Sequence, residues 1–184
     1  PESGTTDLDY FTLETSTGVD AVTAMTVSLL PAGASNNISQ VDLTDGSNVA
    51  KCPSILNPSS NAISFLSCSI SVSTTAATYK VRITPKTHAL MPAPSVGQSY
   101  GATGMVTDFT STNARTLSDT TSATITIDNL SPTGTTGASA SGGDSAATVS
   151  WTNQGDADLY NLVVLRDTAI IGSGSAQADG SSPL

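Results

Sequence analysis

The feature that most constrains the fold of this chain is a two-residue alternation of apolar and polar side chains. It runs through residues 25–29, Met-Thr-Val-Ser-Leu, and residues 79–84, Tyr-Lys-Val-Arg-Ile-Thr. Successive side chains of a β-strand point to opposite faces, so this period is typical of strands with one buried face. Similar segments follow at 100–109 and 123–127, whereas the spacing of an amphipathic helix is nearly absent. We therefore predict an all-β chain, and many short strands separated by turns indicate a β-sandwich.

The alternation also predicts two local features. The apolar residues at positions 63 and 65 are out of phase with those at 68, 70 and 72, which predicts a β-bulge near Leu66. Residues 41–52 predict a hairpin, because two strand-like segments flank Asp45-Gly46 and glycine tolerates the positive φ of a tight turn.

A domain boundary is predicted at residues 128–134, Asp-Asn-Leu-Ser-Pro-Thr-Gly, because proline cannot continue a β-ladder. We expect a sandwich over 1–129, a linker over 130–134 and a second β unit over 135–184. The strands of the second unit are expected at 147–151, 159–166 and 169–171, before a Gly/Ser-rich tail.

The second unit is shorter than a complete sandwich. Ser131 to Leu184 spans 54 residues, whereas a domain of this type needs about 100. Half a sandwich exposes a core face and open strand edges. Two explanations stay open: the sequence is cut within a domain, or a neighbouring chain completes the sheet by strand addition.

Two parts of the chain resemble known surface modules. Residues 100–108 and 118–132 resemble the end of bacterial immunoglobulin-like repeats, over roughly 78–133. Residues 147–153, Ala-Thr-Val-Ser-Trp-Thr-Asn, and residues 156–166 look like the first strands of a fibronectin type III-like module. The resemblance implies an immunoglobulin-like β-sandwich followed by a partial fibronectin type III-like unit. It also implies a large secreted or cell-surface protein in which such modules act as spacers, adhesive segments or appendage subunits.

The two cysteines, Cys52 and Cys68, flank residues 53–60, which we interpret as a loop between strands. We predict that they form a disulfide, which points to an oxidising compartment and an extracellular or cell-surface location. The alternative is two buried free thiols. A zinc site is excluded, because two cysteines and the single His88 cannot supply four ligands.

Charge excludes further classes of partner. The net charge is -9, with six cationic residues, and nucleic-acid binding requires clustered positive charge. No apolar run approaches the roughly 18 residues of a membrane span, so we expect no membrane insertion by this segment. Lys80, Arg82 and Lys86 form one local group of cations, which we interpret as a solvated strand face.

Calcium is the one cofactor that the sequence suggests, because oxygen ligands gather at two places. The candidates are Asp119, Asp128 and Asn129 near the boundary, and Asp156 and Asp158 in the second unit. Their spacing is not that of an EF-hand. Aspartates at turns commonly bond their own backbone instead, so these residues are weak candidates.

Three other features have ordinary structural interpretations. Trp151 is in phase with Val149, so we predict a core anchor and not a sugar-stacking platform. The acceptor patterns for N-glycosylation at Asn37 and Asn129 are attributed to chance in a Ser-rich chain. His88 lies in a proline-rich loop, and no Gly-x-Ser-x-Gly elbow is present, so we expect no enzyme and no catalytic residues.

These observations predict a non-enzymatic extracellular structural subunit or spacer of a cell-surface assembly, with a filament as one form. It would act through β-sheet edge and inter-domain contacts, with copies of itself or neighbouring subunits as partners. The alternative is an adhesion or ligand-binding accessory module of a larger secreted surface protein, with a loop such as 85–99 presenting the contact.

Overall fold

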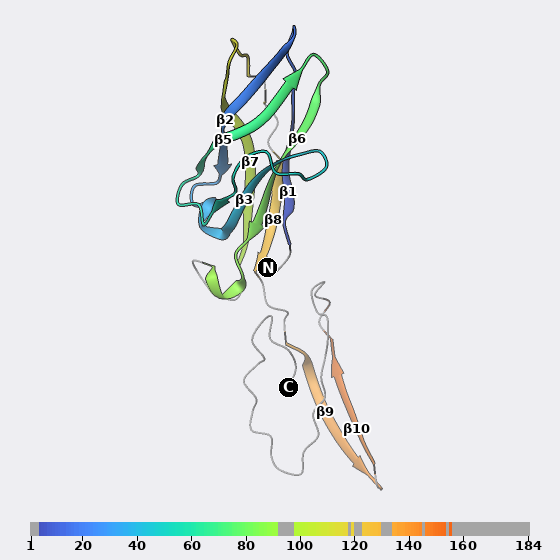
Figure 1. The fold of residues 1–184 in the computed structure, drawn as a ribbon. Helices are drawn as coiled ribbons and strands as arrows, with labels where there is room; N and C mark the ends of the chain where they lie inside the picture. Colours follow the sequence, from blue (N-terminus) through green and yellow to red (C-terminus); the bar gives the residue numbers. More distant parts are fainter. Residues whose placement is uncertain are drawn as a thin grey trace. The chain divides into compact units, whose positions relative to one another are not determined.

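The computed structural model describes residues 4–91, 98–117, 119, 123–129, 134–144, 146–153 and 155. The regular elements among these residues are β-strands and two short 3-10 helices, without an α-helix, so the all-β prediction is confirmed (Figure 1). None of the described helices is long and apolar enough to cross a membrane. The chain divides into two units, Pro1–Asn129 and Leu130–Leu184.

Unit 1 contains the elements from the N-terminus to the last residue of β8. In chain order they are β1 (Thr6–Leu13), β2 (Val19–Leu30), η1 (Ala34–Asn37), β3 (Ile38–Asp45), β4 (Ile55–Leu56), β5 (Ala62–Ser73), β6 (Ala77–Pro85), η2 (His88–Leu90), β7 (Gln98–Ser111) and β8 (Ala123–Asn129).

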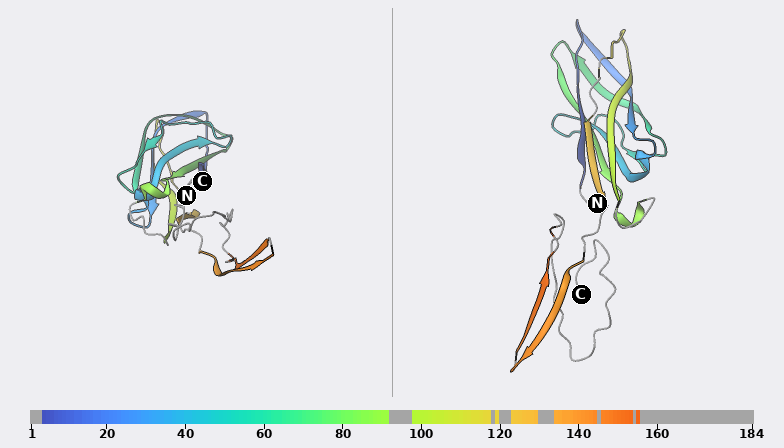
Figure 2. Two further views of the ribbon diagram at one scale, coloured as in Figure 1. Left: turned by 90° about the horizontal axis from the view of Figure 1, so that it is seen from below. Right: turned by 180° about the vertical axis from the view of Figure 1, so that it is seen from behind.

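These strands form two antiparallel sheets that pack as a β-sandwich (Figure 2). One sheet has the order β1-β6-β3-β4 and the other has the order β5-β2-β7-β8. On one side of the sandwich β1 of the first sheet lies beside β7 and β8 of the second. On the opposite side β4 and β5 are the edge strands.

The core of unit 1 is made by the inward faces of alternating strands. Met25, Val27 and Leu29 of β2 are buried, as are Val81 and Ile83 of β6, while the residues between them are partly exposed. Burying an aliphatic side chain of this size contributes about 1.5–3 kcal/mol. The alternation seen in the sequence therefore corresponds directly to the two faces of each sheet.

β5 contains the bulge that its phase change predicts. Val22 of β2 pairs with Ile70 and Ala24 pairs with Leu66, so one residue of β2 faces three residues of β5. Ser67 has a positive φ of 58°, and Leu66 is 67% exposed. The prediction near Leu66 is confirmed.

The disulfide between Cys52 and Cys68 is present, and it joins the segment after β3 to β5 in the other sheet. The predicted hairpin forms its turn at Asp45, but its second arm makes only a single bridge, between Thr44 and Ala50. The chain leaves β3 there because Cys52 is bonded to β5, where the Ser69 N–H also donates to the Lys51 carbonyl. The short β4 pairs with β3 instead.

In unit 2 the described residues form one antiparallel hairpin, β9 (Thr136–Gly143) and β10 (Ala146–Thr152). Its two faces differ in chemistry. Val149 lies opposite Ala140 on the apolar face, and Ser150 lies opposite Ser139 on the other, where their hydroxyls are 2.8 Å apart.

Trp151 is not a buried anchor among the described residues. Its exposed fraction is 38%, that of Val149 is 45%, and the Trp151 indole N–H donates to Asn153 Oδ1. The core position of Trp151 therefore stays a prediction, because a core needs a second layer and the described part of unit 2 is a single two-stranded layer. The expected strands at 159–166 and 169–171 lie outside the described residues.

Candidate functional site

A bulge in β1 places polar groups on both faces of this edge strand. Asp7 pairs with Arg82 and Asp9 pairs with Val81, so Leu8 is an extra residue in the ladder. An extra residue reverses the alternation, and bulges are frequent beside functional sites. As a result Asp7 and Tyr10 share the outer face, while Leu8 and Asp9 are both buried.

The outer face of β1 and β6 carries a charged cluster around the Asp7 carboxylate. This carboxylate accepts hydrogen bonds from the Tyr10 hydroxyl at 2.6 Å, from Lys80 Nζ at 3.0 Å and from Arg82 Nε at 2.6 Å. The Tyr10 hydrogen bond, with those from Lys80 and Arg82, lowers the pKa of Asp7 to about 2 despite partial burial. The Lys80 side chain is 13% exposed and the Arg82 side chain 20%. Both cations thus lie on the outer face, as the sequence predicts, and they are partly exposed while they bind a carboxylate from the neighbouring strand.

The inner face of β1 carries a buried acid. Asp9 is 3% exposed, and its Oδ1 accepts the Tyr10 backbone N–H at 2.9 Å. Its Oδ2 is buried and has no hydrogen-bond partner among the described residues. Burial, together with the negative charge of Asp119, raises the pKa of Asp9 to about 6. A carboxyl group at this position titrates near neutral pH, which is uncommon for an aspartate.

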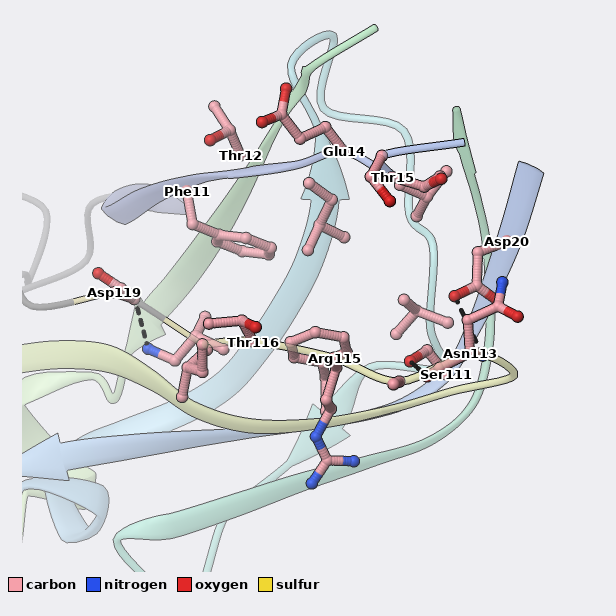
Figure 3. Close-up of a pocket in the computed structure, with 18 of the residues that line it drawn as sticks. Phe11, Thr12, Glu14, Thr15, Asp20, Ser111, Asn113, Arg115, Thr116 and Asp119 are labelled. Carbon is pink, nitrogen blue, oxygen red and sulfur yellow. Dashed lines mark hydrogen bonds between the residues drawn. The ribbon is translucent and has the colours of Figure 1, made fainter. Parts of the chain in front are cut away.

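Asp119 comes from the segment that follows β7. Its Oδ2 accepts the Val106 backbone N–H at 3.0 Å, so the carboxylate is held against β7 (Figure 3). β8 pairs with β7 only from Gln98 to Gly104. The Asp119 side chain thus accepts a hydrogen bond from β7 just after Gly104, the residue at which the pairing of β7 with β8 ends.

A groove of about 920 Å³ lies at this side of the sandwich, between the end of β1 and the segment after β7. Phe11, Phe109 and Val106 contribute apolar surface, and hydroxyl side chains surround it. In Figure 3 the Phe11 ring lies between β1 and the segment that carries Thr116. The groove is therefore a place where both sheets present side chains to one opening.

The calcium candidates from the sequence are not gathered into one site. Asp128 and Asn129 end β8, and Asn129 is fully buried. Asp119 lies in the segment after β7, where its negative charge acts on Asp9, and Asp156 and Asp158 lie outside the described residues. Within the described ranges no group of three or more His, Cys, Asp or Glu residues is arranged to hold a metal ion.

The two glycosylation patterns lie at buried asparagines. Asn37 is 6% exposed and Asn129 is fully buried. An oligosaccharide cannot be carried on a side chain inside the folded protein, so the attribution of both patterns to chance agrees with the structure.

Sequence reasoning missed Asp9, although a signal was available. The apolar residues of β1 are Leu8, Phe11 and Leu13, and the step from 8 to 11 breaks the two-residue period. The same kind of phase change predicted the bulge near Leu66. It would have placed both Leu8 and Asp9 inside, but it could not have shown that the charge of Asp119 acts on Asp9.

No protein-family model matches the chain, and neither the curated proteins nor the solved structures include a significant match to it.

Proposed function

We propose that this chain is a non-enzymatic, extracellular structural subunit or spacer of a cell-surface assembly, and that it works by pairing the edges of its β-sheets with neighbouring chains. A filament is one form that such an assembly takes. The proposal includes an immunoglobulin-like character for unit 1 and a fibronectin type III-like character for unit 2, on the resemblance of residues 100–132 and 147–166 to such modules.

The observation that carries the proposal is the hairpin β9–β10. Its two strands contain no charged residue and no proline, and every described residue in them is exposed. Proteins normally protect edge strands with charges, prolines or a covering segment. A lone two-stranded sheet is only marginally stable in water. A strand or sheet that covers the apolar face of this hairpin would therefore stabilise the hairpin. We propose that a neighbouring chain supplies this covering strand or sheet.

The disulfide and the surface chemistry support an extracellular setting. Disulfides persist in oxidising compartments and are rare in the cytosol. The chain has 28 serines and 28 threonines but only 11% charged residues, so much of its contact with water is made by hydroxyl groups. Unit 1 supplies a rigid sandwich whose sheets are cross-linked by Cys52 and Cys68.

Electron microscopy together with light scattering tests the proposal. The purified chain is expected to form ordered filaments or oligomers. Val149→Lys places a charge on the apolar face of β10 and is expected to reduce assembly, whereas Thr148→Lys, on the hydroxyl face, is the matched control. Dispersed monomers of the unmodified chain across a wide concentration range would contradict the proposal.

The groove of unit 1 favours one alternative, a ligand-binding or adhesion module. Phe11 and Phe109 offer apolar surface there, and threonine and serine hydroxyls offer hydrogen bonds. A panel of glycans and host-surface preparations tests this alternative. Binding that is lost in Phe109→Ala, while the chain remains monomeric, would favour adhesion over assembly.

A further inference from the structure

β7 of unit 1 has a free edge over the second half of its length. β8 pairs with β7 from Gln98 to Gly104, whereas β2 pairs with the opposite edge of β7 as far as Ser111. Among the described residues, no strand pairs with residues 105–111 on the side that β8 leaves open. A free strand edge presents backbone N–H and C=O groups to which another strand can bond.

Carboxylate groups bond the backbone of this free edge in place of a strand. The Val106 N–H donates to Asp119 Oδ2 at 3.0 Å, which a dashed line marks in Figure 3, and the Phe109 N–H donates to Asp108 Oδ1 at 2.9 Å. The guanidinium of Arg115 pairs with Asp108 and lies over the Phe109 ring. Within the described ranges, no backbone–backbone hydrogen bond joins the segment 112–119 to β7. A carbonyl oxygen of an incoming strand can therefore replace the Asp119 carboxylate without breaking a β-ladder.

The groove of unit 1 runs beside this edge and offers apolar surface to an added strand. Val106 and Phe109 of β7, Phe11 of β1 and Leu117 all line it. β1 contributes a second free edge, because its only pairing among the described strands is with β6. Since side chains of a strand alternate between two faces, a strand laid along β7 directs every second side chain into the groove.

β10 of unit 2 has the length and the chemistry that this edge requires. It has 7 residues, Ala146–Thr152, which is the length of the free stretch 105–111. Its apolar side chains Val149 and Trp151 are 45% and 38% exposed, and no described strand pairs with its edge away from β9. It contains no charged residue, so it brings no repulsion to the carboxylates at the edge of β7.

We propose that the free edge of β7 is the acceptor for β10 of a second copy of this chain. The added strand extends the sheet β5-β2-β7-β8, with Val149 and Trp151 in the groove and the hydroxyl face towards solvent. Main-chain hydrogen bonds then replace the carboxylate contacts, and the apolar face of β10 is covered. This pairing rests on the assembly proposed above, for which it supplies the receiving surface.

A peptide with the sequence of residues 146–152 tests the acceptor whether or not the full chain assembles. In NMR spectra of the full chain, kept dilute enough to remain dispersed, this peptide should shift the amide signals of Val106 and Phe109 and slow their hydrogen exchange. The amides of β4, on the opposite side of the sandwich, should not change. A peptide with Val149→Lys should have no effect, because its charge would enter the groove. A peptide with Thr148→Lys, on the hydroxyl face, is the matched control and should act like the unmodified peptide.

Variants of the full chain provide a second test. Leu117→Asp adds a charge to the groove at a position that is 41% exposed, and it should raise the concentration at which the chain assembles by about tenfold. Leu66→Asp changes an exposed leucine of β5, at the opposite side of the sandwich, and should assemble like the unmodified chain. Asp119→Ala frees the Val106 N–H, so this variant should bind the peptide several-fold more tightly.

Two results would overturn the proposal while leaving assembly itself intact. One is a peptide that shifts no signal, or shifts only signals outside residues 105–119 and the groove. The other is equal assembly of Leu117→Asp and Leu66→Asp, which would place the acceptor elsewhere. Weaker peptide binding by Asp119→Ala would likewise contradict replacement of that carboxylate. Peptide binding at β7 in a chain that stays dispersed at every concentration would support the acceptor edge and contradict only the assembly.

Discussion

Gly104 of β7 lies directly against Leu8 of β1: a Cβ atom added to this glycine would stand 2.6 Å from Leu8 Cδ2 and 3.0 Å from Leu8 Cγ. Leu8 is the extra residue of the β1 bulge and is 1% exposed. The absence of a side chain at position 104 therefore makes room for the bulge that also directs Asp9 inward.

Gly104→Ala should destabilise unit 1, because the buried Leu8 side chain has little space to move aside. Overpacking of this kind costs about 1–3 kcal/mol. Gly101→Ala, in the same strand, is the control, since a Cβ there meets nothing within 4 Å. Chemical denaturation of both variants measures the difference. Equal stabilities would show that β1 relaxes around the added methyl group.

Asp9→Asn should stabilise the protein at pH 7.5. The folded-state pKa of Asp9, about 6, lies above its unfolded value of 3.8, so the folded state favours the protonated acid. The associated stability is fully present below about pH 4 and is lost as the pH rises to about 6. Each pKa unit corresponds to about 1.4 kcal/mol, so the variant should gain about 1–3 kcal/mol at pH 7.5.

Denaturation between pH 4 and pH 8 measures this effect. The unmodified chain should lose stability across the lower half of that range, and Asp9→Asn should lose less. Glu14→Gln is the matched control, because Glu14 is an exposed acid near the end of the same strand. A variant that is less stable than the unmodified chain at pH 7.5 would show that Asp9 has a stabilising partner.

Tyr10→Phe should weaken the outer cluster. It removes the hydrogen bond that contributes most to the low pKa of Asp7. Because that pKa is lowered, the stability it provides is present above about pH 4 and is lost as the pH falls towards 2. The cluster is partly open to solvent, so we expect a small loss of stability at pH 7 and a shallower acid transition. Thr12→Val, at an exposed position of the same strand, is the control.

Reduction of Cys52–Cys68 should lower the free energy of unfolding by about 3 kcal/mol, because the bond restricts the unfolded chain. Calorimetry with and without reducing agent measures this loss. The Cys52→Ser/Cys68→Ser double variant has no disulfide, so its Tm should be the same in both conditions. An unchanged Tm on complete reduction would mean that the cross-link contributes little beyond the packing around it.

Much of unit 1 could be predicted from local patterns. The strands around Met25 and Val81, the bulge near Leu66 and the pairing of Cys52 with Cys68 all follow from side-chain period, phase and spacing. Each depends on neighbours in the sequence or on the two cysteines that the chain contains. The same reasoning could not decide whether Trp151 is buried, because the alternation of apolar residues shows which side chains share a face but not what covers that face.

The sequence by itself determined the all-β class, the inward faces of the main strands and the disulfide partners, since period and composition carry that information. Only the tertiary structure decided that Asp7 lies with Lys80 and Arg82 outside, and that the charge of Asp119 acts on the buried Asp9. These encounters join residues more than 70 positions apart. The physical reason is that sheet order and register, together with a one-residue bulge, set such distances, and no local pattern encodes which strands become neighbours.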